Sequence, residues 1–204
     1  MIHFFKITCL SLLLFASGAY AAQAETRLLM LGDSITAGYG LPNDQALPVQ
    51  LENALDDPNI RVINAGVSGD TTAGGQARLD WLLADNPHAV IVALGGNDTL
   101  RGLNPAASAE NLAKILKKLQ DKNIPALLAV MQAPRNMGAE YTQRFDAIFP
   151  ALAEEFSVLF YPFLLQGVAT DPTLNQPDGI HPNPAGVGRI VTGILPLVQE
   201  LLQQ

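Results

Sequence analysis

The chain has 204 residues, of which 49% are hydrophobic and 15% charged, and its formal net charge is −7. This length is sufficient for one domain with a single sizeable core. The negative charge and the lack of any block of Lys or Arg exclude the basic footprint that nucleic-acid binding requires, so no nucleic-acid partner is expected.

The first 24 residues have the three-part layout of a secretory signal peptide. Residues 1–6 carry one positive charge, residues 7–16 form an apolar run, and residues 17–24 are rich in small side chains. Cleavage after Ala21 and cleavage after Ala24 both fit. The apolar run is too short to span a bilayer, so we expect an exported protein, periplasmic or secreted, without a stable membrane anchor.

The single cysteine, Cys9, lies inside this apolar run rather than at its end, which does not favour lipidation. Removal of the signal peptide leaves residues 25–204 as the predicted domain. This mature chain has no thiol and no disulfide, and its histidines are His88 and His181.

Short apolar runs alternate with helical patterns from residue 27 onward. The runs are continuous rather than alternating, which is typical of strands covered on both faces. The expected strands are Leu28–Leu31, Arg61–Ala65, Ala89–Leu94, Ala126–Met131 and Val158–Phe163. The expected helices are Gln45–Asp57, Thr71–Ala84, Pro105–Lys122, Ala139–Phe156 and Pro184–Leu202. This order predicts a single-domain, three-layer α/β/α sandwich with a five-stranded parallel sheet.

Four prolines fall within the helical patterns. Pro105 and Pro184 suit the first turn of a helix, where the missing N–H costs nothing. Pro150 and Pro196 lie further inside and are expected to kink or interrupt their helices.

Motifs that could carry chemistry follow four of the five expected strands. Ser34 follows the first strand in Gly-Asp-Ser, Gly66 the second in Asn-Ala-Gly, and Asn97 the third in Gly-Gly-Asn-Asp. Asp178 and His181 follow the fifth, in Asp-Gly-Ile-His-Pro-Asn. Each motif alone is also typical of a turn or helix cap. Because ligands of open α/β sheets bind at the carboxyl ends of the strands, all four are expected at one edge.

Together these residues supply the parts of an acyl-transfer site. Ser34 is the predicted nucleophile, His181 its base and Asp178 the group that orients the imidazole. The N–H groups of Ser34 and Gly66 and the side-chain amide of Asn97 are the predicted oxyanion donors.

Other site classes fit less well. The α/β-hydrolase elbow requires Gly-x-Ser-x-Gly, and Thr36 stands where its last glycine should be. A dinucleotide fingerprint would need glycine in place of Ser34, and a P-loop would need a Gly-Lys pair. A metal site lacks ligands, because His88 is expected at the opposite edge of the sheet. We therefore expect no metal and no cofactor.

The Gly-Asp-Ser, Gly-Gly-Asn-Asp and Asp-Gly-Ile-His-Pro-Asn blocks, in this order, resemble the SGNH (GDSL) hydrolases. Within that family they are most similar to the exported thioesterase, lysophospholipase and arylesterase branch. The resemblance extends from residue 29 through the last helix and implies the flavodoxin-like SGNH fold. It implies hydrolysis of carboxylic esters and thioesters through an acyl-enzyme on Ser34. The roles it implies for the site residues agree with those above: Ser34, Asp178 and His181 as the triad, and Ser34, Gly66 and Asn97 as the oxyanion hole.

The substrate is expected to be a small acyl ester or thioester, lipid esters included, bound by a monomer. Two loops, 100–104 and 132–138, could flank its acyl chain. The candidate contacts, which could equally be ordinary packing residues, are Leu100, Leu103, Met131, Pro134 and Met137. Two alternatives stay open: an SGNH acyltransferase or carbohydrate deacetylase, and a non-hydrolytic lipid- or glycan-binding protein.

Overall fold

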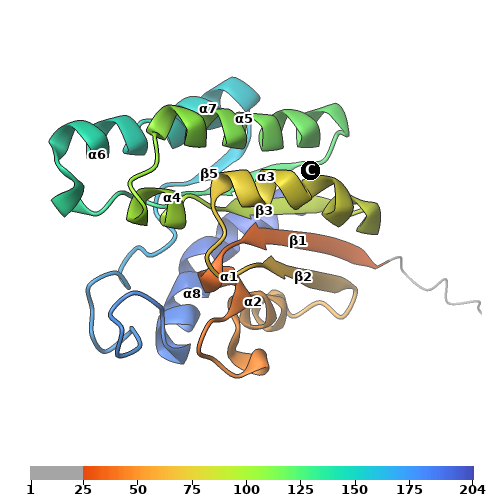
Figure 1. The fold of residues 1–204 in the computed structure, drawn as a ribbon. Helices are drawn as coiled ribbons and strands as arrows, with labels where there is room; N and C mark the ends of the chain where they lie inside the picture. Colours follow the sequence, from red (N-terminus) through yellow and green to blue (C-terminus); the bar gives the residue numbers. More distant parts are fainter. Residues whose placement is uncertain (1–24) are drawn as a thin grey trace, which may run out of the picture.

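Five parallel strands form the centre of the fold, in the order β2-β1-β3-β4-β5 (Figure 1). The computed structural model describes residues 25–204, so the predicted signal peptide, residues 1–24, lies outside the described residues. The strands are β1 (Thr26–Gly32), β2 (Ile60–Gly66), β3 (Ala89–Ala93), β4 (Ala126–Ala129) and β5 (Leu159–Tyr161). The predicted parallel sheet is confirmed, although β4 and β5 are shorter than expected.

Helices cover both faces of this sheet (Figure 1). The helices on one face are α2 (Leu47–Leu55) and α8 (Pro184–Leu201). Those on the other are α3 (Thr72–Leu82), α5 (Pro105–Asp121), α6 (Ala139–Asp146) and α7 (Ile148–Phe156). Within β1, Leu28 and Met30 enter one core while Leu29 and Leu31 enter the other. This double burial explains why the strands have continuous apolar sequences.

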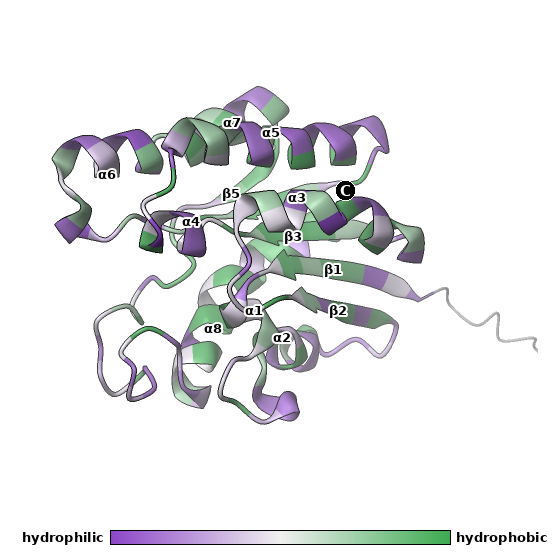
Figure 2. Ribbon diagram, in the orientation of Figure 1, coloured by the Kyte–Doolittle hydropathy of each residue, from purple (hydrophilic) through white to green (hydrophobic). Residues whose placement is uncertain are grey.

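Hydrophobic residues are concentrated in the central sheet, and hydrophilic residues recur on the helices that cover it (Figure 2). In Figure 2 the central strands are largely green, whereas purple residues recur along α5 and α6. Within residues 25–204, no helix combines the length and the apolar character needed to cross a bilayer.

Two short helices begin where β1 and β3 end, and sequence periodicity did not predict them. They are α1 (Ser34–Ala37) and α4 (Gly96–Leu100). The carboxylate of Asp33 caps α1 by accepting the N–H of Ile35 at 3.0 Å. One turn of helix is too short to show an apolar period, yet these turns hold Ser34 and Asn97 at the carboxyl edge. The 3₁₀ turns are η1 (Asn43–Gln45), η2 (Leu83–Asp85) and η3 (Arg135–Met137).

Proline had different effects in different helices. Pro105 and Pro184 occupy the first turns of α5 and α8, as predicted. The expected helix 139–156 is divided at Ala147, three residues before Pro150, which has no N–H to bond the preceding turn. At Pro196, where a kink or an interruption was predicted, α8 is not interrupted and runs on to Leu201.

Candidate active site

Ser34, His181 and Asp178 form one chain of polar contacts at the carboxyl edge of the sheet. The Ser34 Oγ lies 2.9 Å from Nε2 of His181, although the two residues are 147 positions apart. On the other side of the ring, Nδ1 of His181 lies 2.6 Å from Oδ2 of Asp178. The structure therefore brings together all three residues of the predicted triad, with the imidazole in the middle.

The loop that carries His181 is held from several directions. The carbonyl of His181 accepts the backbone N–H of Gln176 at 2.7 Å, and the side-chain amide of Gln176 donates to the carbonyl of Tyr39 at 2.7 Å. The ring of Tyr39 packs on the imidazole, with centroids 4.5 Å apart and planes inclined by 37°. These contacts restrict the imidazole to a position facing Ser34.

Asp178 is ionised across the neutral range. The backbone N–H of His181 donates to Asp178 Oδ1 at 3.0 Å, and the N–H of Ile180 does so at 2.9 Å. The hydrogen bonds from the N–H and the ring of His181, followed by that from Ile180, lower the pKa of Asp178 to about 2. This carboxylate keeps the ring proton on Nδ1, so Nε2 is free to accept the hydroxyl proton of Ser34.

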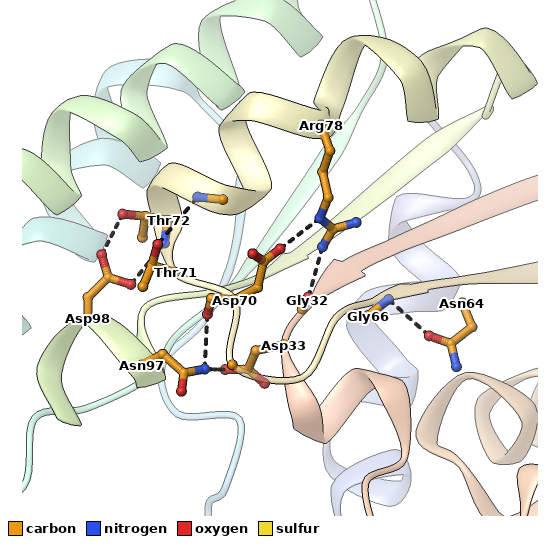
Figure 3. Close-up of polar contacts among 12 residues, drawn as sticks. Gly32, Asp33, Asn64, Gly66, Asp70, Thr71, Thr72, Arg78, Asn97 and Asp98 are labelled. Carbon is orange, nitrogen blue, oxygen red and sulfur yellow. Dashed lines mark hydrogen bonds and ion pairs between the residues drawn. The ribbon is translucent and has the colours of Figure 1, made fainter. Parts of the chain in front are cut away.

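The side-chain amide of Asn97 lies near the carboxylate of Asp33, the residue before Ser34 (Figure 3). Its Nδ2 donates to the carbonyl oxygen of Asp70 at 2.9 Å and lies 3.4 Å from Oδ2 of Asp33. The first contact is short and the second long, so one amide hydrogen is firmly held while the other is only weakly bound.

Asp98, which follows Asn97, anchors this segment and was not singled out from the sequence. Its side chain is 1% exposed, and it accepts the backbone N–H of Thr72 and the hydroxyl of Ser108, each at 2.8 Å. The carboxylate thereby joins the first turns of α3 and α5 to α4.

Gly66 does not have the geometry that an oxyanion donor needs. Its N–H donates to Oδ1 of Asn64 at 3.0 Å (Figure 3). The next N–H, of Val67, donates to Gly32 of β1. Because successive N–H groups of a strand point to opposite sides, that of Gly66 faces the open edge of the sheet. The structure thus argues against this predicted role.

The absence of a side chain at Gly66 has a packing reason instead. A Cβ there would lie 2.2 Å from the backbone nitrogen of Ala37, so only glycine allows β2 to end against α1. Gly66 therefore helps to place the turn of helix that begins with Ser34.

Gly69 lies in the loop that follows β2, and its N–H has no acceptor among residues 25–204. Within residues 25–204, neither the N–H of Gly69 nor that of Ser34 donates a hydrogen bond to another group. Gly69 has φ +83°, a conformation that favours glycine. Its carbonyl accepts a hydrogen bond from the guanidinium of Arg101 at 2.6 Å.

Comparisons with known proteins place the chain among hydrolases, which agrees with the contacts of Ser34, His181 and Asp178. The model of the GDSL-like Lipase/Acylhydrolase family matches residues 30–189. The chain belongs to this family. The predicted resemblance is confirmed, and the chain is an ester hydrolase, as its motifs indicated.

Individual relatives match over most of their length. The chain is 41% identical to the protein named esterase TesA of Pseudomonas aeruginosa, over 95% of the chain and 96% of that protein. It is 43% identical to the thioesterase 1/protease 1/lysophospholipase L1 of Escherichia coli K12, over 80% and 78%. A crystal structure of TesA superposes with a TM-score of 0.82 at 40% identity, covering 86% of the chain and 99% of the structure.

A cleft of about 520 Å³ opens in front of Ser34 in this hydrolase. Of the five predicted substrate contacts, three line it: Leu100, Met131 and Pro134. Leu103 and Met137 do not, and the carbonyl of Leu103 instead accepts the hydroxyl of Tyr141. Apolar lining residues that were missed are Phe163, Leu165 and Ile180. They lie in the irregular segments after β5, where no periodicity indicates which side chains face the cleft.

His88 lies far from this chemistry, as expected. Its Nδ1 accepts the backbone N–H of Arg27 at 3.0 Å, at the opposite end of β1. In the part of the chain that the structure describes, no three His, Cys, Asp or Glu side chains gather as metal ligands would.

Asp33 places a buried carboxyl group next to Ser34. Its side chain is 3% exposed, and burial raises its pKa to about 6, against the opposing effects of the Ile35 N–H and the nearby His181. The folded state therefore retains a proton that the unfolded chain loses at its ordinary value of 3.8. The protonated carboxyl group of Asp33 therefore favours the folded state at pH values below 3.8. This contribution to stability is lost as the pH rises through about 6.

The variant Asp33→Asn tests this effect, because it keeps an acceptor for the N–H of Ile35 but cannot ionise. Urea unfolding should show the variant gaining up to about 3 kcal/mol relative to the parent between about pH 4 and pH 8. A difference in unfolding free energy that stays constant over this range would contradict the raised pKa.

Proposed function

We propose that the protein hydrolyses carboxylic esters and thioesters through an acyl-enzyme on Ser34. The observation that carries this proposal is the continuous contact from Ser34 Oγ through His181 to Asp178, with distances of 2.9 and 2.6 Å. Such a chain pairs a nucleophile with a base and the base with a group that orients it.

In the proposed mechanism, the hydroxyl oxygen of Ser34 attacks the acyl carbonyl while Nε2 of His181 takes the hydroxyl proton. Asp178 stabilises the imidazolium that forms. The tetrahedral intermediate collapses, the bond to the alcohol or thiol breaks, and His181 returns the proton to the departing group. Water then attacks the acyl-enzyme with His181 again as base, which releases the acid and restores Ser34.

The oxyanion is proposed to be held by the N–H of Ser34, the N–H of Gly69 and the side-chain amide of Asn97. Gly69 takes the place of Gly66 in this set, since the Gly66 N–H is already donated to Asn64. The N–H groups of Ser34 and Gly69, which have no acceptor among residues 25–204, and the weakly bound hydrogen of Asn97 support this assignment. Donors that are fixed before the reaction contribute most when the negative charge develops.

The cleft favours substrates with medium or long acyl chains. It offers about 520 Å³ in front of Ser34, with Phe163, Leu165 and Ile180 among its apolar lining residues. Each buried methylene contributes about 0.8 kcal/mol, so binding should strengthen as the chain lengthens. A deacetylase would need a small closed pocket with polar groups for a sugar. Thioesters are included because the Escherichia coli relative bears the name thioesterase 1.

A series of p-nitrophenyl esters tests the activity and the chain preference together. We expect kcat/KM to rise from acetyl to at least hexanoyl, and acyl thioesters to release thiol and free acid. Ser34→Ala is the control and should lose about three to six orders of magnitude in turnover. A maximum at acetyl would favour a deacetylase, transfer of the acyl group to added alcohols without free acid would favour an acyltransferase, and no turnover would favour a binding protein.

The proposal includes export and action as a monomer outside the cytoplasm. The layout of residues 1–24 supports export. N-terminal sequencing of the protein from the periplasmic or extracellular fraction should begin at Ala22 or Glu25. A mature protein in that fraction that still begins at Met1 would contradict cleavage.

A further inference from the structure

A partly buried ion pair between Asp70 and Arg78 joins segments that are distant in the sequence (Figure 3). Arg78, in the second turn of α3, places Nε 2.7 Å from Oδ2 of Asp70 and Nη2 3.0 Å from the carbonyl oxygen of Gly32. The side chains of Arg78 and Asp70 are only 20% and 15% exposed. The planar guanidinium therefore ties the loop before α3 to the end of β1, two residues before Ser34.

Asp70 connects this ion pair to the proposed oxyanion donors. Its backbone carbonyl accepts the amide of Asn97 at 2.9 Å, and the preceding residue is Gly69. A displacement of Asp70 would therefore rotate or release the Asn97 amide and shift the Gly69 N–H. Neither Asp70 nor Arg78 lines the cleft, so any effect of these two residues on the reaction is indirect. It can pass through the Asn97 and Gly69 donors, or through the contact of Arg78 with Gly32, two residues before Ser34.

Gly74 provides the space in which the Asp70 carboxylate lies. A Cβ at this position would meet Oδ1 of Asp70 at 2.0 Å. Glycine is a poor helix former, yet here, inside α3, it allows the carboxylate to lie against the helix backbone. The carboxylate thus has a defined place as well as a charged partner.

We propose that Asp70 and Arg78 are positioning residues for the oxyanion hole, acting through Asn97 and Gly69. This inference rests on the function proposed above. The oxyanion donors must be held accurately in place, because displacement of a catalytic group by about 1 Å can lower the rate about 100-fold.

The first test replaces the ion pair. Arg78→Met should lower kcat by about 10- to 100-fold while KM changes less than about twofold, and Arg78→Lys should restore part of the loss. The double variant Asp70→Asn/Arg78→Met leaves no unpaired buried charge, so it should fold even where the single variant does not, and it should show the same loss. Gly74→Ala, which displaces the carboxylate alone, should lower kcat as well.

The matched control is another ion pair of α3. Lys118 contacts Asp80 at 2.7 Å, and the side chain of Asp80 is 73% exposed. Asp80→Asn removes a pair from the same helix without touching Asp70 or Gly32. It should leave kcat and KM unchanged. An equal fall of kcat in this control would show that any disturbance of α3 suffices, which would overturn the positioning role.

A double-mutant cycle with Asn97→Ala separates positioning from general damage. Asn97→Ala alone should lower kcat by about 10²- to 10³-fold. If Arg78 acts through Asn97, then Arg78→Met should cost a much smaller factor in that background. If the losses of kcat caused by Arg78→Met and Asn97→Ala multiply fully, the inference is overturned. Wild-type kcat in both Asp70→Asn/Arg78→Met and Gly74→Ala would overturn it as well. Absence of ester hydrolysis by the parent protein would instead overturn the proposed function, and this inference with it.

Discussion

The contact between Ser34 Oγ and Nε2 of His181, at 2.9 Å, is the interaction on which the proposed chemistry of this hydrolase depends. It joins the residue after the first strand to a loop after the fifth. The order β2-β1-β3-β4-β5 makes this possible, because all five strands are parallel and present their carboxyl ends at one edge. The helices on both faces keep that edge in place, and the contacts of Gln176 and Tyr39 bring the His181 loop back to it.

Much of this arrangement could be predicted from the sequence, because the responsible forces act locally or through burial. The strands are buried on both faces and so consist of continuous apolar residues, which the chain shows plainly. The proximity of the three proposed triad residues could be predicted because Asp178 and His181 lie three apart in one turn, and because Ser34 follows a strand whose end must lie at the same edge. The family match over residues 30–189 agrees with these inferences.

Other features depend on directions in space that residue order does not reveal. Gly66 ends β2 and Gly69 lies in the loop that follows, but the N–H of Gly66 faces the sheet edge, and only the hydrogen bond from the Val67 N–H to the Gly32 carbonyl shows this. Which apolar side chains face the cleft was equally hidden in irregular loops, so Leu103 was included and Phe163 overlooked. At Pro196 the sequence predicted a kink or an interruption, and the interruption does not occur: α8 continues in spite of the N–H that proline lacks.

The central claim is that Ser34 is the nucleophile and that His181 activates it. Its most direct test is labelling of the folded protein with a fluorophosphonate, followed by mass spectrometry of the whole chain and of its peptides. The account predicts one phosphonyl group per chain, on the peptide that contains Ser34, with no label on Ser34→Ala and much slower labelling of His181→Ala. A label on any other residue, or undiminished labelling of Ser34→Ala, would contradict it.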